Sequence, residues 1–358
     1  MGKEIKKCNG IGYFSLARGV GMIAIVLGHS ITPILSIEEK QELFSGAGSV
    51  FGAGIIAMFF MISGFGFYKR SFRKCIAIQS KLLLRPYICV AGCVLLSKII
   101  LAFVKQRSFR KHGGELVLTY LFGLNGEGGG EILGIPIESV SVFWFVLALF
   151  GGWMIYNEIQ RIPLKAVQWA VVMICVLTSY WLTMISKIWP FCLPMVLLAT
   201  GYLAIGDIIR KQQLLEKRLP IWAWLLIFVN IIVSMAYGQI NIVACVWKMG
   251  ILDVTGSFCM GFIFLRLYTK IMRDSFEGKC FELIEKIGFY SIWVVCLHAY
   301  EKIVFPWYRI YAIWPQTPWL AVVVCFAGRC IVMYVLYRTA SFFIHIKKKR
   351  KKRVVLED

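Results

Sequence analysis

The chain alternates between long, continuous apolar stretches and short segments rich in lysine and arginine. The apolar stretches lack the polar residue at every second position that a membrane barrel strand of about ten residues needs. A helix that crosses a bilayer needs about 17 to 25 such residues, since no water is present there to satisfy its backbone. We therefore expect ten spanning helices, over residues 13–35, 50–68, 82–104, 142–156, 167–185, 188–205, 221–237, 242–265, 287–305 and 319–344.

The charges between these stretches predict how the chain crosses the membrane. Most of the 40 lysines and arginines fall in alternate connections, beginning with the N-terminal segment and ending with the C-terminal tail. Cytoplasmic loops carry this excess. The sequence thus predicts an all-α polytopic bundle, one domain over residues 1–358, with both termini and a basic tail (346–358) in the cytoplasm. Because the tail directly follows a span, we expect it to bind anionic lipid and not nucleic acid.

The composition supports a membrane environment and argues against a metal site. Apolar residues make up 59% of the chain and charged residues 16%, whereas a soluble domain has about 25% charged residues. A water-soluble protein is therefore excluded. The four histidines, His29, His112, His298 and His345, are not at metal-ligand spacing, and no carboxylate cluster lies in a span. We expect no metal.

Arg18 and His29 are the most informative polar residues, because ionisable groups inside a span are costly and are functional candidates by default. They are eleven residues apart, which is close to three helical turns. They therefore share one helix face, about 16 Å apart along the axis, with Arg18 towards the cytoplasm. Two interpretations stay open. Either Arg18 snorkels and His29 bonds a neighbouring helix, or the pair serves a charged donor inside and an acceptor outside.

Four more ionisable groups within the predicted spans are candidates for a site or an ion pair. His298 and Glu301 are three residues apart on one helix face, so the carboxylate either orients the imidazole or makes a structural hydrogen bond with it. Asp253 and Arg329 each fall near the middle of a span, and we expect them to form an interhelical ion pair.

Two further residues have both a structural and a functional interpretation. Ser63 precedes Gly64, a pairing that favours close helix packing or pore lining over a nucleophilic role. Trp144 is expected at the outer end of its span. It either belongs to the aromatic belt at the interface or lines an acceptor site.

Several of these residues belong to segments that occur in a characteristic order: Arg18-Gly19 with 26–30, then 59–65, then 144–149, then Ile287-Gly288 with Ser291 and His298. In this order they resemble acyltransferase family 3, a family of integral-membrane O-acyltransferases, over most of the chain. One departure is Ser15, where family members often have an acidic residue.

The resemblance implies transfer of an acyl group, usually acetyl, from cytoplasmic acyl-CoA to a hydroxyl of a carbohydrate or other envelope acceptor, in a bacterial cytoplasmic membrane. Acetyl-CoA would be a substrate, and no bound cofactor is implied. His29 is the expected catalytic base, because a hydroxyl is a weak nucleophile and an imidazole with a pKa near 6.5 is suited to take its proton.

The phosphates of coenzyme A need cations on the cytoplasmic side. The candidates for acyl-donor binding are Arg18, Arg70, Arg73, Lys81 and Arg85. In relatives, two arginines separated by two other residues often precede a proline. Here Lys81 and Arg85 precede Pro86. The two arginines with the family's spacing, Arg70 and Arg73, lie earlier in the chain. The alternative for the last four is ordinary charge of a cytoplasmic loop.

A membrane transporter or flippase of an envelope precursor is the main rival, because buried charges such as Lys248, Asp253 and Arg329 also occur in substrate pathways. The chain lacks the internal repeat that many transporters show. A relative that only senses or scaffolds is the third possibility. Turnover of acyl-CoA separates both from an acyltransferase.

Overall fold

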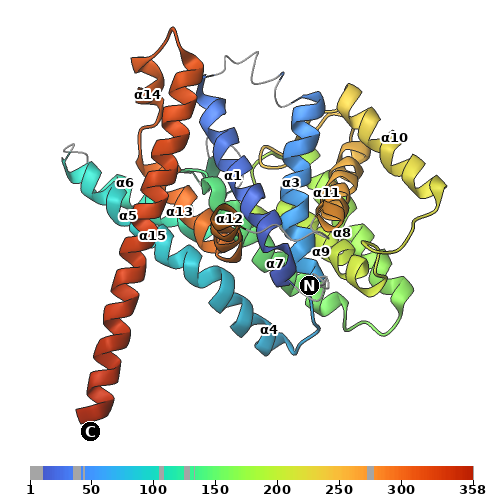
Figure 1. Ribbon diagram of the computed structural model, residues 1–358, viewed down its shortest axis with the longest axis horizontal. Helices are drawn as coiled ribbons and strands as arrows, with labels where there is room; N and C mark the ends of the chain where they lie inside the picture. The colour runs from blue at the N-terminus through green and yellow to red at the C-terminus, as the bar shows by residue number, and fades with distance from the viewer. Residues whose placement is uncertain are drawn as a thin grey trace.

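The computed structural model of the chain describes residues 11–34, 42, 45–104, 109–124, 130–132, 134–271 and 278–357. Figure 1 shows an arrangement built almost wholly from helices, which confirms the expected all-α membrane bundle. Within the described residues, eight helices are long and apolar enough to cross a membrane, where the sequence predicted ten spans. They cover Gly12–Ile31, Gly46–Phe65, Phe72–Val104, Ser141–Ile159, Lys165–Ile185, Pro190–Lys211, Ile251–Ile271 and Pro318–Thr339.

The elements follow in this order. The first half contains η1 (Ile11–Phe14), α1 (Ser15–Ile31), η2 (Thr32–Ile34), α3 (Gly46–Phe65), α4 (Phe72–Gln79), η3 (Ser80–Leu84), α5 (Arg85–Val104), α6 (Phe109–Phe122), β1 (Gly130–Ile132), β2 (Ile135–Ile137), η4 (Ser141–Phe143) and α7 (Trp144–Ile159). The second half contains α8 (Lys165–Ile185), η5 (Pro190–Cys192), α9 (Leu193–Lys211), α10 (Ile221–Tyr237), β3 (Ile240–Asn241), β4 (Val246–Trp247), α11 (Ile251–Ile271), α12 (Lys279–Phe289), α13 (Ser291–Val304), α14 (Tyr308–Ile313) and α15 (Pro318–Glu357). The strands form two small antiparallel hairpins.

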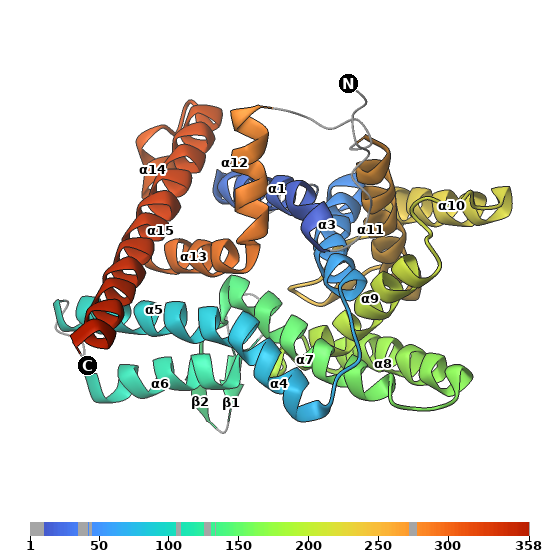
Figure 2. The same cartoon turned by 60° about the horizontal axis from the view of Figure 1, so that its bottom comes forward.

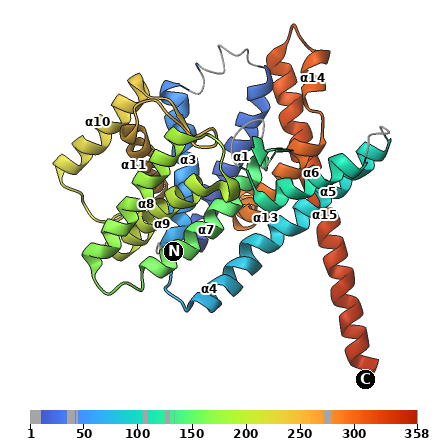
Figure 3. The same ribbon diagram turned by 180° about the vertical axis from the view of Figure 1, so that it is seen from behind.

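The helices form two groups with α1 between them, as Figures 1 and 3 both show. One group holds α3, α8, α9, α10 and α11, in which α3 packs against α9 and α11. The other holds α5, α6, α13 and α15, in which α13 packs against α5 and α15. The helix α1 contacts α12, α13 and α15. The first motif segment, which lies on α1, is therefore next to the last helices of the chain.

The predicted ninth span, 287–305, is wrong. The chain turns at Tyr290, between α12 and α13, and Figure 2 shows α13 leaving the end of α12 at a sharp bend. The 14 residues of α13 extend about 21 Å, which is shorter than the hydrocarbon core of about 30 Å. An apolar run gives no sign of such a bend, so hydropathy alone merged two helices.

The predicted eighth span, 242–265, begins too early. Residues before Ile251 form the hairpin of β3 and β4, and α11 then starts. Asp253 holds this junction, since its Oδ2 accepts hydrogen bonds from the backbone N–H of Met249 at 2.9 Å and of Gln239 at 3.2 Å. A carboxylate expected to pair with a distant arginine instead satisfies local backbone donors. The predicted seventh span, 221–237, coincides with the 17 residues of α10.

The third span is longer than expected. One helical rod runs from Phe72 to Val104, through α4, the π-helical turn η3 and α5. The π turn ends two residues before Pro86, whose missing N–H and ring interrupt regular α-helical bonding. The basic residues expected in a cytoplasmic loop at 69–85 therefore lie mostly on helix. The connection between the third and fourth predicted spans likewise contains α6 and the first hairpin.

Helix ends that the alternating topology assigns to the cytoplasm meet on one face. The rings of Phe14, before α1, and Phe65, at the end of α3, are 5.1 Å apart. Tyr268, near the end of α11, donates its hydroxyl to the Tyr13 carbonyl at 2.7 Å. These three ends therefore share one face, as the alternating topology predicts for the first, second and eighth spans. Side chains of the basic tail lie outside the described part of the chain.

The contact between α1 and α12 depends on two glycines. A Cβ added to Gly288 would lie 1.7 Å from the Ser15 carbonyl oxygen, and one added to Gly19 would lie 2.0 Å from the Ile284 carbonyl oxygen. Both obstacles are backbone atoms, which cannot rotate away. Only glycine at both positions lets the helices approach this closely, and this approach sets where α13 begins.

We predict that Gly288→Ala destabilises the protein by about 1–3 kcal/mol, the usual cost of overpacking, because α12 must move away from α1. Thermal unfolding in nanodiscs measures this. Gly92→Ala is the control, since its new methyl meets nothing within 4 Å and replaces a helical glycine. An unchanged melting temperature for Gly288→Ala would contradict the described contact.

Candidate active site

Two histidines from distant parts of the chain lie ring against ring. His29 is near the end of α1, and His298 is in α13. Their ring centroids are 5.1 Å apart and the rings are inclined by 35°. The contact unites the first and last of the motif segments, and it places two titratable groups together inside the bundle. Neither the spacing nor the hydropathy of the sequence indicated this pairing.

Glu301 forms the centre of the charged cluster beside these rings. Its Oε1 is 2.6 Å from His298 Nδ1, one turn earlier on α13. It also accepts two hydrogen bonds from Arg329 Nη1 on α15, at 2.8 and 3.0 Å. The side chains of His298 and Glu301 are fully buried, and that of Arg329 is 3% exposed. The expected facing of His298 and Glu301 is therefore found, whereas the predicted pairing of Arg329 with Asp253 is wrong.

Aromatic residues after α13 complete the cluster. Trp307 Nε1 donates to the Glu301 carbonyl at 3.0 Å, and the Arg329 guanidinium lies 5.1 Å from the centre of the Trp307 ring. Arg329 Nη2 also reaches the His29 carbonyl at 3.4 Å. Tyr311 of α14 donates its hydroxyl to the Ser30 carbonyl. The end of α1 is thus held by α14 and α15 as well as by α13.

Arg18 lies at the other end of α1, about three turns from His29. Its Nη2 approaches the Ser15 hydroxyl at 3.4 Å, a long and weak contact. Its buried Nε has no hydrogen-bond partner among the described residues. Ser15 stands where family members often have an acid, so the nearest side-chain acceptor on the helix is neutral. The arginine keeps donors for an anion.

Arg70 is fixed by its backbone. Its N–H donates to Asn157 Oδ1 at 3.0 Å, and Asn157 Nδ2 donates to its carbonyl at 3.0 Å. Its guanidinium lies 5.9 Å from the centre of the Trp153 ring. The loop between α3 and α4 is thereby locked to the end of α7, with the charged group of Arg70 left at the predicted cytoplasmic face.

The other three donor-binding candidates lie along the rod formed by α4, η3 and α5. Arg73, Lys81 and Arg85 are all exposed, and within the described part of the chain their side chains make no hydrogen bond or ion pair. In that part, the side chain of Arg18 hydrogen-bonds to that of Ser15. The structure thus places them on helix, as available cations.

Ser63 and Trp144 both contact neighbouring helices inside the bundle. Ser63 Oγ accepts a hydrogen bond from Trp153 Nε1 at 2.9 Å. A Cβ on the adjacent Gly64 would lie 2.2 Å from the Leu203 carbonyl oxygen, which agrees with the expected close helix packing. Trp144 is 5% exposed, with its ring centroid 6.4 Å from that of Phe60. It is buried among helices, so the interfacial-belt interpretation does not hold.

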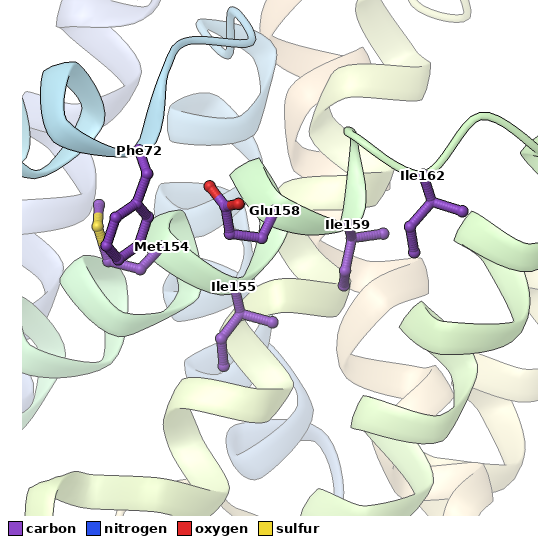
Figure 4. A pocket seen from close by; sticks show the side chains of 6 residues that line it. All are labelled: Phe72, Met154, Ile155, Glu158, Ile159 and Ile162. Atoms are coloured by element: carbon purple, nitrogen blue, oxygen red, sulfur yellow. The ribbon is translucent and has the colours of Figure 1, made fainter.

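An apolar groove of about 440 Å³ opens beside the start of α4 and the end of α7 (Figure 4). It is lined by Phe72, Met154, Ile155, Glu158, Ile159 and Ile162. Glu158, its single charged group, accepts hydrogen bonds from Asn157 and Arg161. The groove therefore adjoins Arg70, and its one carboxylate is already paired with Arg161, unlike the His29 and His298 rings.

Metal-ligating groups do not cluster in the part of the chain that the structure describes, where no three His, Cys, Asp or Glu side chains are placed to hold an ion. Sequence reasoning recognised His29, His298 and Glu301 but gave Arg329 the wrong partner. Nothing in the sequence links Glu301 and Arg329, which lie 28 residues apart on different helices. The sequence likewise did not indicate the turn at Tyr290 or the contact between Trp307 and Arg329.

Comparison with known proteins agrees with this arrangement. A family model for an acyltransferase domain matches residues 11–338, nearly the whole chain. Searches of curated proteins and of solved structures gave no match. The matched region includes α1 with Arg18 and His29, α13 with His298 and Glu301, and Arg329 of α15. The chain is therefore a multi-pass membrane protein that belongs to acyltransferase family 3.

Proposed function

We propose that the protein transfers an acyl group, acetyl in the simplest case, from cytoplasmic acyl-CoA to a hydroxyl of an extracytoplasmic carbohydrate or other envelope acceptor, in the cytoplasmic membrane of a bacterium. The observation that carries the proposal is the contact between the rings of His29 and His298, which lie at the opposite end of α1 from Arg18. In this geometry the cation that would bind the donor, Arg18, and the base that would act on the acceptor, His29, lie at opposite ends of one helix.

The acyl transfer needs a base in the protein that removes the proton of the acceptor hydroxyl. The acceptor oxygen attacks the carbonyl carbon of the thioester, a C–O bond forms and the C–S bond breaks. The hydroxyl proton must leave during the attack, and His29 takes it. The proton finally goes to the sulfur of coenzyme A, which leaves as the thiol. Transfer inside the bundle keeps water away from the thioester, which limits its hydrolysis.

The donor is proposed to enter from the face that holds Arg18. The phosphates of coenzyme A bind there, and the extended pantetheine arm carries the thioester along α1 towards His29, over about 16 Å. Arg18 is suited to this because its buried Nε has no partner among the described residues. Arg70, Arg73, Lys81 and Arg85 supply further positive charge at the same face.

We predict that His29→Ala lowers the rate of acetyl transfer by roughly 10²–10⁴-fold, the usual contribution of a general base. The assay measures free coenzyme A released from acetyl-CoA by purified protein in nanodiscs, with a crude envelope-glycan extract as acceptor. Release by the wild type must depend on the extract.

Leu27→Ala is the matched control, because Leu27 lies two residues away on the same helix and is 39% exposed. This variant should keep wild-type activity. A His29→Ala protein with full activity would remove the proposed base. A wild-type protein that neither releases coenzyme A nor gains thermal stability from acetyl-CoA would favour a transporter or scaffold.

Arg18→Ala is expected to weaken donor binding and leave the chemical step nearly intact. Loss of a charge-assisted hydrogen bond costs about 1.5–3 kcal/mol, which corresponds to a tenfold or greater rise in the KM for acetyl-CoA. The kcat should stay within about threefold. Arg338→Ala removes the same charge at an exposed position of α15 and should leave both constants unchanged. A lower kcat at unchanged KM would contradict the donor role.

A further inference from the structure

The partners of Glu301 determine the tautomer of His298. Glu301 receives two hydrogen bonds from Arg329, so it is a carboxylate and can only accept. His298 Nδ1, at 2.6 Å from Glu301, must then carry the hydrogen. In the neutral ring the lone pair is left on Nε2. This is the arrangement of an oriented general base, in which a carboxylate holds one ring nitrogen and frees the other.

The Nε2 atom of His298 is one of the few buried side-chain polar atoms that lack a hydrogen-bond partner in the described part of the chain. The residue itself is fully buried. A buried polar atom without a partner costs about 1–3 kcal/mol. Such a cost calls for a functional explanation. The ring of His29 lies against the same imidazole.

The surrounding charges favour a proton on His298 over one on His29. Lys302 and Arg329 both repel positive charge on either ring. His298 has Glu301 to offset this repulsion, at hydrogen-bonding distance. Among the described residues, the groups that act on His29 include no such carboxylate. A positive charge at His298 therefore has a carboxylate partner within hydrogen-bonding distance.

We propose that His298 is the proton-accepting partner of His29 in the acyl transfer, an inference that rests on the proposed function. The acceptor O–H bond breaks and its proton moves to His29 while the C–O bond forms. The onward step to His298 Nε2 needs a hydrogen bond between the two rings, which the structure does not show and which forms when the substrates are bound, as catalytic hydrogen bonds often do. When the C–S bond breaks, the proton returns through His29 to the sulfur of coenzyme A. Glu301 stabilises the His298 imidazolium, and Arg329 holds Glu301 in place through two hydrogen bonds. His298 thus positions the proton and acts through His29.

Two substitutions at His298 distinguish this role from simple packing. His298→Gln retains an amide N–H that can bond Glu301 but cannot accept a proton, and His298→Ala opens space beside His29. We expect both to lower kcat at least tenfold while the KM for acetyl-CoA stays within about threefold. Added imidazole should restore activity to His298→Ala in proportion to its concentration and should not restore His298→Gln, in which the space is filled.

Melting temperatures and coenzyme A release by the wild type are measured alongside. Wild-type kcat in His298→Gln would overturn the inference, as would a folded His298→Ala protein that imidazole cannot rescue. Should His298→Ala fail to fold, the kcat of His298→Gln decides alone. Failure of the proposed function is a separate result, since the wild type would then release no coenzyme A and the relay would have no reaction to serve.

Discussion

The site depends on one constraint: the buried negative charge of Glu301 must be balanced by hydrogen-bond donors. A fully buried carboxylate is tolerable only when paired, and here Arg329 binds both of its oxygens while His298 binds one. Removing one partner of a buried pair costs about 3–5 kcal/mol. The cluster therefore fixes α15 to α13 although α13 is too short to span. Because Arg329 also reaches the His29 carbonyl, the same cluster orients the end of α1.

The two faces of the bundle differ in their charged and titratable side chains. At the predicted cytoplasmic face, Arg18 and the basic residues from Arg70 to Arg85 are exposed or lack full hydrogen bonding in the described part of the chain. Towards the other face, the positive charge of Arg329 is neutralised by Glu301 and two imidazoles lie together. Uncompensated cations suit an anionic donor, and neutral imidazoles suit a hydroxyl acceptor. The backbone contact of Gly19 and Gly288 holds α1 in register between these regions.

Hydropathy and charge predicted the helical class and the order of crossings, because both depend on local composition. They failed where a long-range contact overrides the local pattern. Tyr290 ends a helix within an apolar run because α12 must cross α1 through Gly288. Asp253 and Arg329 looked like partners because both seemed to be isolated charges in the membrane. Their real partners, the backbone at Gln239 and Met249 and the side chain of Glu301, are set by the fold. His29 was found from its span and its motif, whereas its contact with His298 required the structure.

The measurement that tests the account most directly is the sidedness of the reaction. Purified protein is reconstituted in sealed vesicles in one orientation, acetyl-CoA is supplied on the side of the basic face, and a crude envelope-glycan extract on the other. The account predicts that free coenzyme A appears with the donor while acetyl groups appear on the glycan across the membrane. Acetylation that occurs only when donor and glycan share one side would contradict the division of the site between two faces.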